Sequence, residues 1–260
     1  MKRPVILGGA ARRLAPAAQK GICIVFTTVL FDLDGTLLPM DQDIFLKDYF
    51  SRLCAWCAPR GYEPKALIDA LWASTRAMIK NDGSRKNREV FWESFVRIFG
   101  DKVLDDEAYF DEFYATEFRH VQKSCGFAPE AGEIIAFLKG RGVRLALATN
   151  PIFPAAATRA RAQWANLRLS DFACVTTYEN ACHSKPNPAY YADILAQLGC
   201  PARDCLMVGN DAHEDTAAAA LGIGVFLLTD NLINRDNRDT SRYPQGNFSD
   251  LFAYLRENVK

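Results

Sequence analysis

A buried strand that ends in two acidic residues limits the folds open to this chain. Residues 22–31 are mostly apolar, and Asp32 and Asp34 follow them directly, just before the turn residue Gly35. A short apolar run that stops at turn residues is typical of a buried strand. Ligands of open α/β sheets bind outside the carboxyl ends of the strands, so we expect the acidic pair to lie at a functional site.

The spacing of the two acids predicts their chemistry. Residues two apart in an extended segment point to the same side, so Asp32 and Asp34 face one site unless the turn at Gly35 redirects the second. Two carboxylates this close repel each other unless a cation or a shared proton intervenes. Mg²⁺ takes oxygen ligands and keeps several waters, so a magnesium site is the simplest interpretation. The alternative is an ordinary acidic turn after a core strand.

The second half of the chain predicts a parallel sheet. From Pro129 onward, helical and strand patterns alternate, as they do in βαβ units. Strands are expected at residues 143–148, 173–176, 205–208 and 223–228, and helices at 129–139, 154–167, 189–198 and 249–257, with one more through the alanine run before Gly222. Residues 231–248 are polar, and we expect an irregular surface loop there. The predicted fold class is therefore α/β.

Four helices are predicted between the first strand and this alternating region. They cover residues from 42 to about 60, from 64 onward, 87–99 and 105–121. Apolar residues recur at helical spacing in each, and no convincing strand pattern interrupts them, so we expect a compact all-helical insertion. Its basic residues Arg85, Lys86 and Arg88 either meet an anionic substrate or form a solvated face.

Composition excludes some classes of partner. The 260 residues include 31 basic and 31 acidic side chains, so no overall charge favours nucleic acid or an anionic membrane. No apolar stretch approaches the roughly 20 residues of a membrane helix. Eight cysteines lack the density of a secreted disulfide scaffold, and we expect a reducing cytoplasm. Cys54 and Cys57 have redox-motif spacing but fall inside a predicted helix, which favours a packing role.

Polar residues follow three later strands of the predicted sheet. The carboxyl ends of parallel strands share one edge, so these residues can converge with Asp32 and Asp34. Each has an ordinary alternative: a strand-ending turn, a solvated lysine, or a helix N-cap and first-turn acid. Their shared order and placement favour one site, which comprises Thr149 and Asn150, Lys185, and Asp211 and Asp215.

With these four motifs in order, the chain resembles the haloacid dehalogenase superfamily, in the phosphatase branch whose helical cap is inserted just after the first strand. That branch includes proteins similar to phosphoglycolate phosphatase and β-phosphoglucomutase. The resemblance implies a Rossmann-like parallel-sheet core with an inserted all-helical cap domain. We expect the core at residues 22–40 and 125–260, the cap at 41–124, and a flexible extension at 1–21.

The resemblance also implies a role for each residue. Asp32 would attack phosphorus and form an aspartyl-phosphate, and Asp34 would act as acid and then as base. Thr149, Asn150 and Lys185 would bind the phosphate. Mg²⁺ would be held by Asp32, the backbone carbonyl of Asp34, Asp211, and Asp215 either directly or through its neighbours. Asn210 directly follows Gly209, where the family more often has an acid, and the acid comes one place later. This shift favours Asp211 over Asp215 as the primary metal ligand.

The expected function is a magnesium-dependent phosphatase acting on a small soluble phosphate monoester. Asp34 favours this interpretation over dehalogenation, because a halide leaving group needs no acid. A phosphomutase would use the same aspartyl-phosphate, and a non-catalytic binding protein on the same fold is the remaining alternative. Phosphonate cleavage would need a cap lysine that the sequence does not identify. The sequence leaves open which phosphate monoester is the substrate, and whether the protein is a monomer or a dimer.

Overall fold

The computed structural model describes residues 25–259, which form a six-stranded, all-parallel sheet flanked by helices. The spatial order is β3-β2-β1-β4-β5-β6. The strands are β1 (Thr28–Phe31), β2 (Arg144–Leu147), β3 (Cys174–Val175), β4 (Cys205–Gly209), β5 (Gly224–Leu228) and β6 (Gln245–Gly246). This architecture confirms the predicted α/β class.

Strand β1 lies in the middle of the sheet, between β2 and β4. After β3 the chain crosses to the other side of β1 and adds β4, β5 and β6 in turn. A crevice forms where the strand order reverses in this way, outside the carboxyl ends of the strands. The two acids that follow β1 therefore lie at the natural ligand position of the fold.

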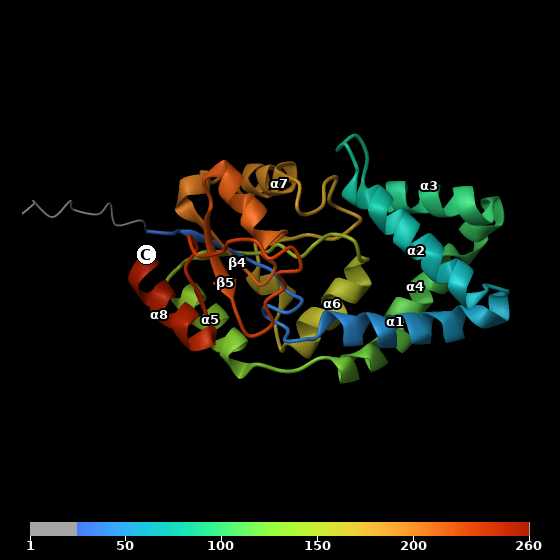
Figure 1. Cartoon of the computed structure of the whole chain (residues 1–260), viewed down its shortest axis with the longest axis horizontal. Coiled ribbons are helices and arrows are strands. Elements are labelled where there is room, and N and C mark those ends of the chain that lie inside the picture. The colour runs from blue at the N-terminus through green and yellow to red at the C-terminus, as the bar shows by residue number, and fades with distance from the viewer. Residues whose placement is uncertain (1–24, 260) are drawn as a thin grey trace, which may run out of the picture.

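Helices cover both faces of the sheet because side chains of a strand alternate between them. Val29 and Phe31 belong to one apolar cluster, with α5 (Pro129–Gly140) and α8 (Phe248–Asn258). Leu30 belongs to the other cluster, with α7 (Pro188–Leu198). Figure 1 shows α5 and α8 on one side of the strands and α7 on the other. The result is a three-layered arrangement with β1 buried at its centre.

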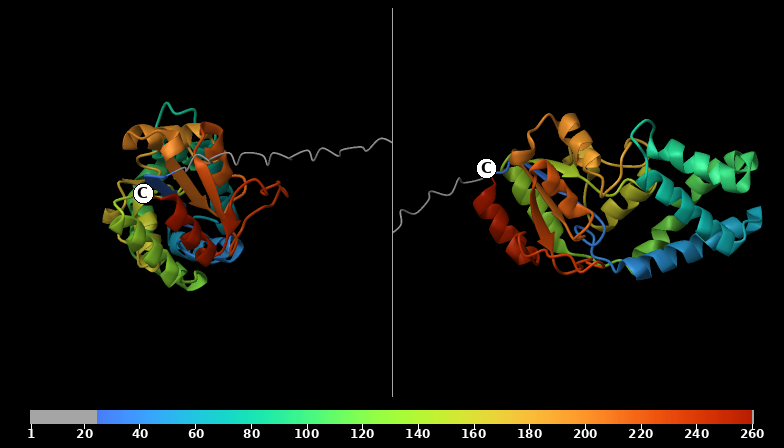
Figure 2. Two further views of the ribbon diagram at one scale, coloured as in Figure 1. Left: turned by 90° about the vertical axis from the view of Figure 1, so that its left-hand side faces the viewer. Right: turned by 45° about the horizontal axis from the view of Figure 1, so that its top comes forward.

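Four α-helices gather at the end of the molecule away from the chain's C-terminus (Figures 1 and 2). They are α1 (Gln42–Cys57), α2 (Pro64–Ile79), α3 (Asn87–Phe99) and α4 (Glu107–Ala115). Asp41 caps α1 by accepting hydrogen bonds from two backbone amides of its first turn, and Glu63 does the same for α2. The helices agree with the expected insertion, while the division into core and cap domains stays a prediction.

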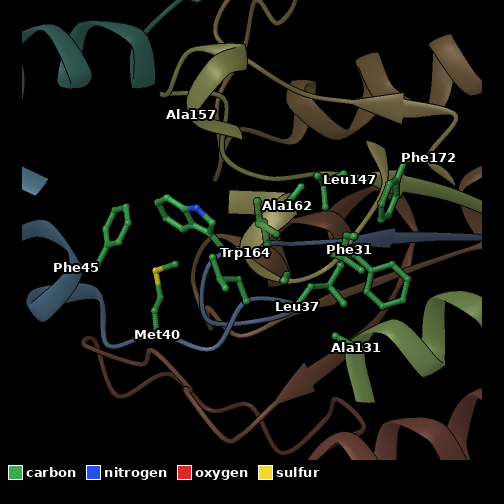
Figure 3. Packing of buried hydrophobic residues seen from close by; sticks show 14 of the residues in the cluster. Phe31, Leu37, Met40, Phe45, Ala131, Leu147, Ala157, Ala162, Trp164 and Phe172 are labelled. Atoms are coloured by element: carbon green, nitrogen blue, oxygen red, sulfur yellow. The ribbon is translucent and has the colours of Figure 1, made fainter. Parts of the chain in front are cut away.

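One apolar cluster joins these helices to the sheet. Figure 3 shows it running from Phe31, beneath the sheet, past Leu37 and Met40 to Phe45 of α1. Trp164, the last residue of α6 (Ala155–Trp164), stacks on Phe118 with ring centroids 5.2 Å apart. The helical end is therefore packed against the sheet on this side.

Three sequence expectations about elements were wrong in detail. The first strand begins at Thr28 rather than at residue 22, although residues 22–24 lie outside the described part of the chain. The helix expected at 105–121 is α4 flanked by two 3-10 helices, because the backbone leaves helical geometry at Thr116 (φ −121°). The loop expected at 231–248 contains β6, whose two residues are too few to produce a sequence pattern.

Two further features concern membranes and cysteine chemistry. Within residues 25–259, no helix has the length and apolar character needed to cross a membrane. Cys54 and Cys57 are buried in α1, and burial raises the pKa of the Cys57 thiol to about 12. A thiol with so high a pKa is a poor nucleophile, which agrees with the expected packing role.

Candidate active site

A cavity of about 350 Å³ lies between the carboxyl edge of the sheet and helices α1–α4. The structure brings the residues of all four predicted motifs together at its sheet side. Lys185 lies behind the cavity wall and bonds to two of the others. The predicted residues that line the cavity directly are Asp32, Asp34, Thr149, Asn150, Asp211 and Asp215.

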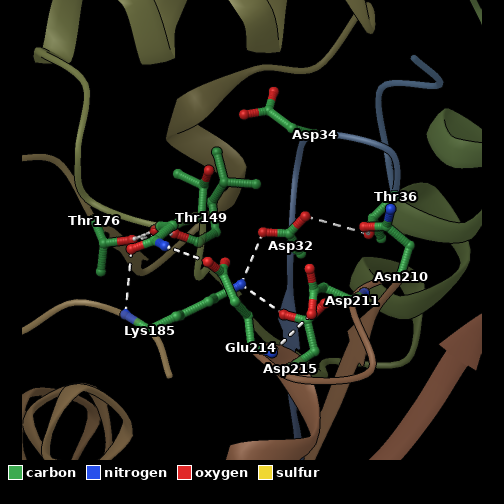
Figure 4. Close-up of polar contacts among 12 residues, drawn as sticks. Asp32, Asp34, Thr36, Thr149, Thr176, Lys185, Asn210, Asp211, Glu214 and Asp215 are labelled. Carbon is green, nitrogen blue, oxygen red and sulfur yellow. Dashed lines mark hydrogen bonds and ion pairs between the residues drawn. The ribbon is translucent and has the colours of Figure 1, made fainter. Parts of the chain in front are cut away.

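Lys185 links two carboxylates at the centre of the site (Figure 4). Its fully buried Nζ donates to Asp32 Oδ1 at 2.8 Å and to Asp215 Oδ1 at 2.7 Å. Burial raises the pKa of Asp32, and although Lys185 opposes this effect, the pKa reaches about 7. Burial alone would lower the pKa of Lys185, but the carboxylates of Asp215 and Asp32 raise it well above its ordinary value. Lys185 is therefore a fixed buried cation beside Asp32.

The turn after Asp32 is held by a close backbone approach. Gly35 adopts φ +78°, and a Cβ there would lie 2.2 Å from Asn210 Nδ2, so a larger residue would be strained and would clash. Thr36 Oγ1 donates to Asn210 Oδ1 at 2.9 Å and lies 3.3 Å from Asp32 Oδ2. These contacts fix the backbone around Asp34 against the loop after β4.

Asp34 is turned away from Asp32 (Figure 4), so the turn at Gly35 does redirect it. Its Oδ2 forms an ion pair with Arg161 of α6, a guanidinium buried beneath the site and lying 4.5 Å from the ring centre of Phe153. Its Oδ1 has no hydrogen-bond partner among the described residues. Burial raises the pKa of Asp34, against the opposing effect of Arg161.

Arg161 is a site residue that the sequence did not indicate. It stands in a short helix with Arg159 two positions earlier. From sequence alone, an arginine in such a helix is expected to be exposed to solvent. Its burial depends on Asp34 and Phe153, which come from other segments, so no local pattern reveals it.

Thr149 and Asn150 follow β2 and line the cavity. Thr149 is buried, and its hydroxyl forms no hydrogen bond within residues 25–259, whereas its carbonyl accepts from Thr176 Oγ1 at 2.7 Å. Asn150 Nδ2 donates to Glu214 Oε1 at 2.9 Å, and its Oδ1 accepts from the backbone amide of Lys185 at 3.2 Å. Asn150 therefore ties three strand exits together, and phosphate binding by its amide stays a prediction.

Asp211 and Asp215 line the same cavity, but they do not stand on one helix. The helix through the alanine run is a 3-10 helix that begins at Asp215, so Asp211 precedes it. Asp211 Oδ1 accepts from the backbone amides of His213 and Glu214 at 2.7 and 2.8 Å. Both oxygens of Asp215 are engaged, one by Lys185 and the other by the Asp211 backbone amide at 2.8 Å. Asp215 therefore holds the loop and Lys185 in place.

The charge balance of the site suits a divalent cation. Five carboxylates line its sheet side, against the two buried cations Lys185 and Arg161. One of the five, Glu214, was not predicted, and burial raises its pKa to about 8. In the part of the chain that is described, no three His, Cys, Asp or Glu side chains converge closely enough to enclose a metal ion. The carboxylate and carbonyl oxygens at this edge are donors of the kind that Mg²⁺ takes together with waters, and a magnesium site there stays a prediction.

Comparisons with known proteins concern the family and the fold. The sequence profile of the haloacid dehalogenase-like hydrolases matches residues 26–222. The fold resembles that of 2-haloacid dehalogenase from Pseudomonas syringae pv. Tomato DC3000, with a TM-score of 0.59 and 20% identity over 89% of this chain and 99% of that chain. This likeness is one of fold, and it covers nearly the whole described structure.

Two curated relatives match part of the chain. The probable phosphatase IndB of Dickeya dadantii (strain 3937) is 33% identical over 101 residues, which are 39% of this chain and 43% of the relative. Phosphoglycolate phosphatase of Yersinia pestis is 30% identical over 128 residues, which are 49% of this chain and 52% of the relative. The chain spans about half the length of each. On the profile match and the fold, the chain belongs to the haloacid dehalogenase-like hydrolases.

Proposed function

We propose that this chain is a magnesium-dependent phosphatase that hydrolyses a small phosphate monoester through an aspartyl-phosphate on Asp32. The observation that carries the proposal is the placement of Asp32 at the end of the central strand, on the cavity, with Lys185 Nζ 2.8 Å from its Oδ1. A carboxylate held beside a fixed cation suits attack on an electrophile whose oxygens carry negative charge.

In the first step, an oxygen of Asp32 forms a bond to phosphorus while the bond from phosphorus to the alcohol oxygen breaks. Lys185 supplies positive charge beside the phosphoryl oxygens, where negative charge spreads in the transition state. The Thr149 hydroxyl, which is free of hydrogen bonds within the described chain, would donate to one of these oxygens. Positioning and electrostatic stabilisation thus supply most of the rate enhancement.

Asp34 would move the proton. Burial raises its pKa, which favours the protonated form needed to protonate the departing alcohol. Arg161 holds Oδ2, which leaves Oδ1 for the leaving oxygen. Once Asp34 is ionised, it would take a proton from the water that attacks the aspartyl-phosphate, so that phosphate is released and Asp32 restored.

Mg²⁺ would be held by Asp32, the backbone carbonyl of Asp34 and Asp211, whose Oδ2 makes no hydrogen bond among residues 25–259. Asp215 would support this set through the backbone of Asp211 and through Lys185. When bound, the ion would neutralise the excess of carboxylates and draw the phosphate toward Asp32. The ligand positions are supported by the placement of these residues around one cavity.

Transfer of the phosphoryl group to a second hydroxyl, as in a phosphomutase, would use the same residues. It would also need a site that holds a phosphorylated sugar in two orientations. No cationic side chain on the helical side of the cavity, among the described residues, offers a second phosphate site. Hydrolysis is therefore the better supported reaction.

The test is release of inorganic phosphate from 4-nitrophenyl phosphate and from a panel of phosphorylated metabolites, with and without Mg²⁺. We expect metal-dependent turnover, and a loss of about 10⁴-fold or more in Asp32→Asn. The matched control is Asp250→Asn, which makes the same chemical change at an exposed position of α8 that does not line the cavity, and it should leave turnover unchanged. An Asp32→Asn protein that retains native turnover would refute the proposal.

A further inference from the structure

Aromatic side chains of helices α1–α4 line the helical side of the cavity. Six side chains form what we call the aromatic roof: Phe45 and Phe50 of α1, Trp72 of α2, Phe91 and Trp92 of α3, and Phe110 of α4. Phe50 and Trp72 meet edge to face with ring centroids 5.6 Å apart, and Trp72 keeps 39% of its surface exposed. A ligand against Trp72 would remove apolar surface from water, which favours binding.

The ionisable side chains around the cavity are almost all acidic. The acidic side chain that the helices contribute to the cavity lining is Asp111 of α4. Within the described chain, Arg235 is the one basic side chain that lines the cavity. The Arg235 side chain is 67% exposed, and its Nη2 already lies 3.1 Å from Asp43 Oδ1. Arg235 is therefore a solvated, paired cation rather than a buried anion site.

The basic cluster of the helical region is engaged elsewhere. Arg85 and Arg88 form ion pairs with glutamates, and Lys86 Nζ donates to the carbonyl of Asn180 at 2.8 Å. None of the three lines the cavity. Of the two alternatives that the sequence left open, the structure thus favours a solvated face over contact with an anionic substrate.

We infer that the alcohol released from the substrate is uncharged and mostly apolar, with an aromatic ring or a branched aliphatic group that fills the aromatic roof. This inference rests on the phosphatase function proposed above. A second phosphate or a carboxylate at the roof would lose its hydration without gaining a buried cation as a partner. An aromatic or aliphatic group would instead pack against rings that are already in place.

An enzyme that cleaves phosphoglycolate must accept a different leaving group, one that carries a carboxylate. A site built to pair that carboxylate needs a buried cation, since a buried charge is tolerated only when it is paired. The structure places its buried cations, Lys185 and Arg161, at the sheet edge, where both are bonded to carboxylates of the site.

The experiment compares two phosphate esters of primary alcohols, 2-phenylethyl phosphate and 2-phosphoglycolate, using the full chain with Mg²⁺. We expect kcat/KM to be at least about 100-fold higher for 2-phenylethyl phosphate. Trp72→Ala should lower kcat/KM for this ester by about tenfold and leave that for ethyl phosphate unchanged. Phe127→Ala is the matched control, because Phe127 is 57% exposed and does not line the cavity.

A second variant reverses the charge at Asp111, beside the aromatic roof. Asp111→Arg adds a cation on the helical side, and we expect it to raise kcat/KM for 2-phosphoglycolate about tenfold or more relative to 2-phenylethyl phosphate. A native preference for 2-phosphoglycolate would overturn the inference while leaving the phosphatase function intact. If the protein hydrolysed none of the substrates, neither these two esters nor 4-nitrophenyl phosphate nor a metabolite of the panel, the proposed function would be overturned, and the inference with it.

Discussion

The two sides of the cavity differ in how their side chains are held. At the sheet edge, Asp32, Lys185 and Asp215 form a buried chain of ion pairs, and hydrogen bonds from the neighbouring loops fix them further. On the helical side, rings pack against one another and leave apolar surface facing the cavity. If the proposed function holds, this contrast means that the edge performs one reaction on any phosphate ester, whereas the roof selects the alcohol.

Among substitutions that test this contrast, we expect replacement of Asp34 to have the largest effect on kcat. Asp34→Asn should lower kcat for alkyl phosphates by about 10³-fold, because their alkoxide leaving groups need a proton. For 4-nitrophenyl phosphate, whose leaving group needs none, the first step should be nearly unchanged. Initial rates on both esters, with a burst measurement for the aryl ester, check the difference. Equal losses in the first step for both esters would show that Asp34 is not the acid.

Lys185 gives the next largest effect, and it acts on activity and stability together. Lys185→Met should lower kcat by about 10²–10³-fold for every ester. The variant loses the positive charge beside the phosphoryl oxygens, which every ester shares, and leaves the contacts to the alcohol unchanged. It also leaves the buried carboxylates of Asp32 and Asp215 without a cation, so the free energy of unfolding should fall by about 3–5 kcal/mol. Steady-state rates and urea unfolding measure the two effects.

Lys65→Met is the control for Lys185→Met, since Lys65 pairs with Asp69 on the exposed face of α2. An exposed pair of this kind contributes little to the free energy of unfolding, because water and salt screen the two charges. If both lysine variants lost the same small amount of stability, the buried ion-pair chain would not hold the sheet edge together.

The smallest effect concerns Asn87, which joins α3 to the loops after β2 and β3. Asn87 is fully buried at the start of α3, and its Nδ2 donates to the carbonyl of Pro151 at 3.1 Å and to Ser184 Oγ at 3.0 Å. Asn87→Ala should lower the free energy of unfolding by about 1–3 kcal/mol, since buried acceptors lose their donor. It should also raise KM several-fold with little change in kcat, because the roof would no longer be held over the site.

For Asn87→Ala, thermal unfolding and steady-state kinetics are the measurements. Asn258→Ala serves as the control, because Asn258 ends α8 and donates only to the Tyr254 carbonyl of its own helix. A large fall in kcat with unchanged KM would show that Asn87 affects the reaction at the sheet edge. That result would contradict the claim that Asn87 acts by holding the roof over the site.

The sheet edge was more predictable than the roof, for a physical reason. Parallel strands place their carboxyl ends together, so a polar residue after each apolar strand is enough to predict that Asp32, Thr149, Lys185 and Asp211 converge. Asp32, Thr149 and Asp211 line one cavity, and Lys185 bonds to Asp32 behind its wall. This placement agrees with the prediction, while the catalytic roles of these residues stay predictions.

The roof could not be predicted to the same depth. Helical spacing predicted that rings such as Phe45 and Trp72 lie on apolar stripes, but not which of them face a cavity, since that depends on how α1 and α2 are placed relative to the sheet. Arg161 was missed because its partner, Asp34, lies far away in the sequence. The 3-10 geometry at Asp215 was missed because the alanine run after it favours an α-helix.

The most direct test of the central claim is to find the covalent intermediate. Asp34→Asn, mixed rapidly with 4-nitrophenyl phosphate and Mg²⁺, should release one nitrophenolate per chain in a burst, because the second step lacks its base. Acid quenching and mass spectrometry of the digested protein should then locate the phosphoryl group on Asp32. Hydrolysis of the ester without a phosphoryl group on Asp32, or with one on another residue, would contradict the account.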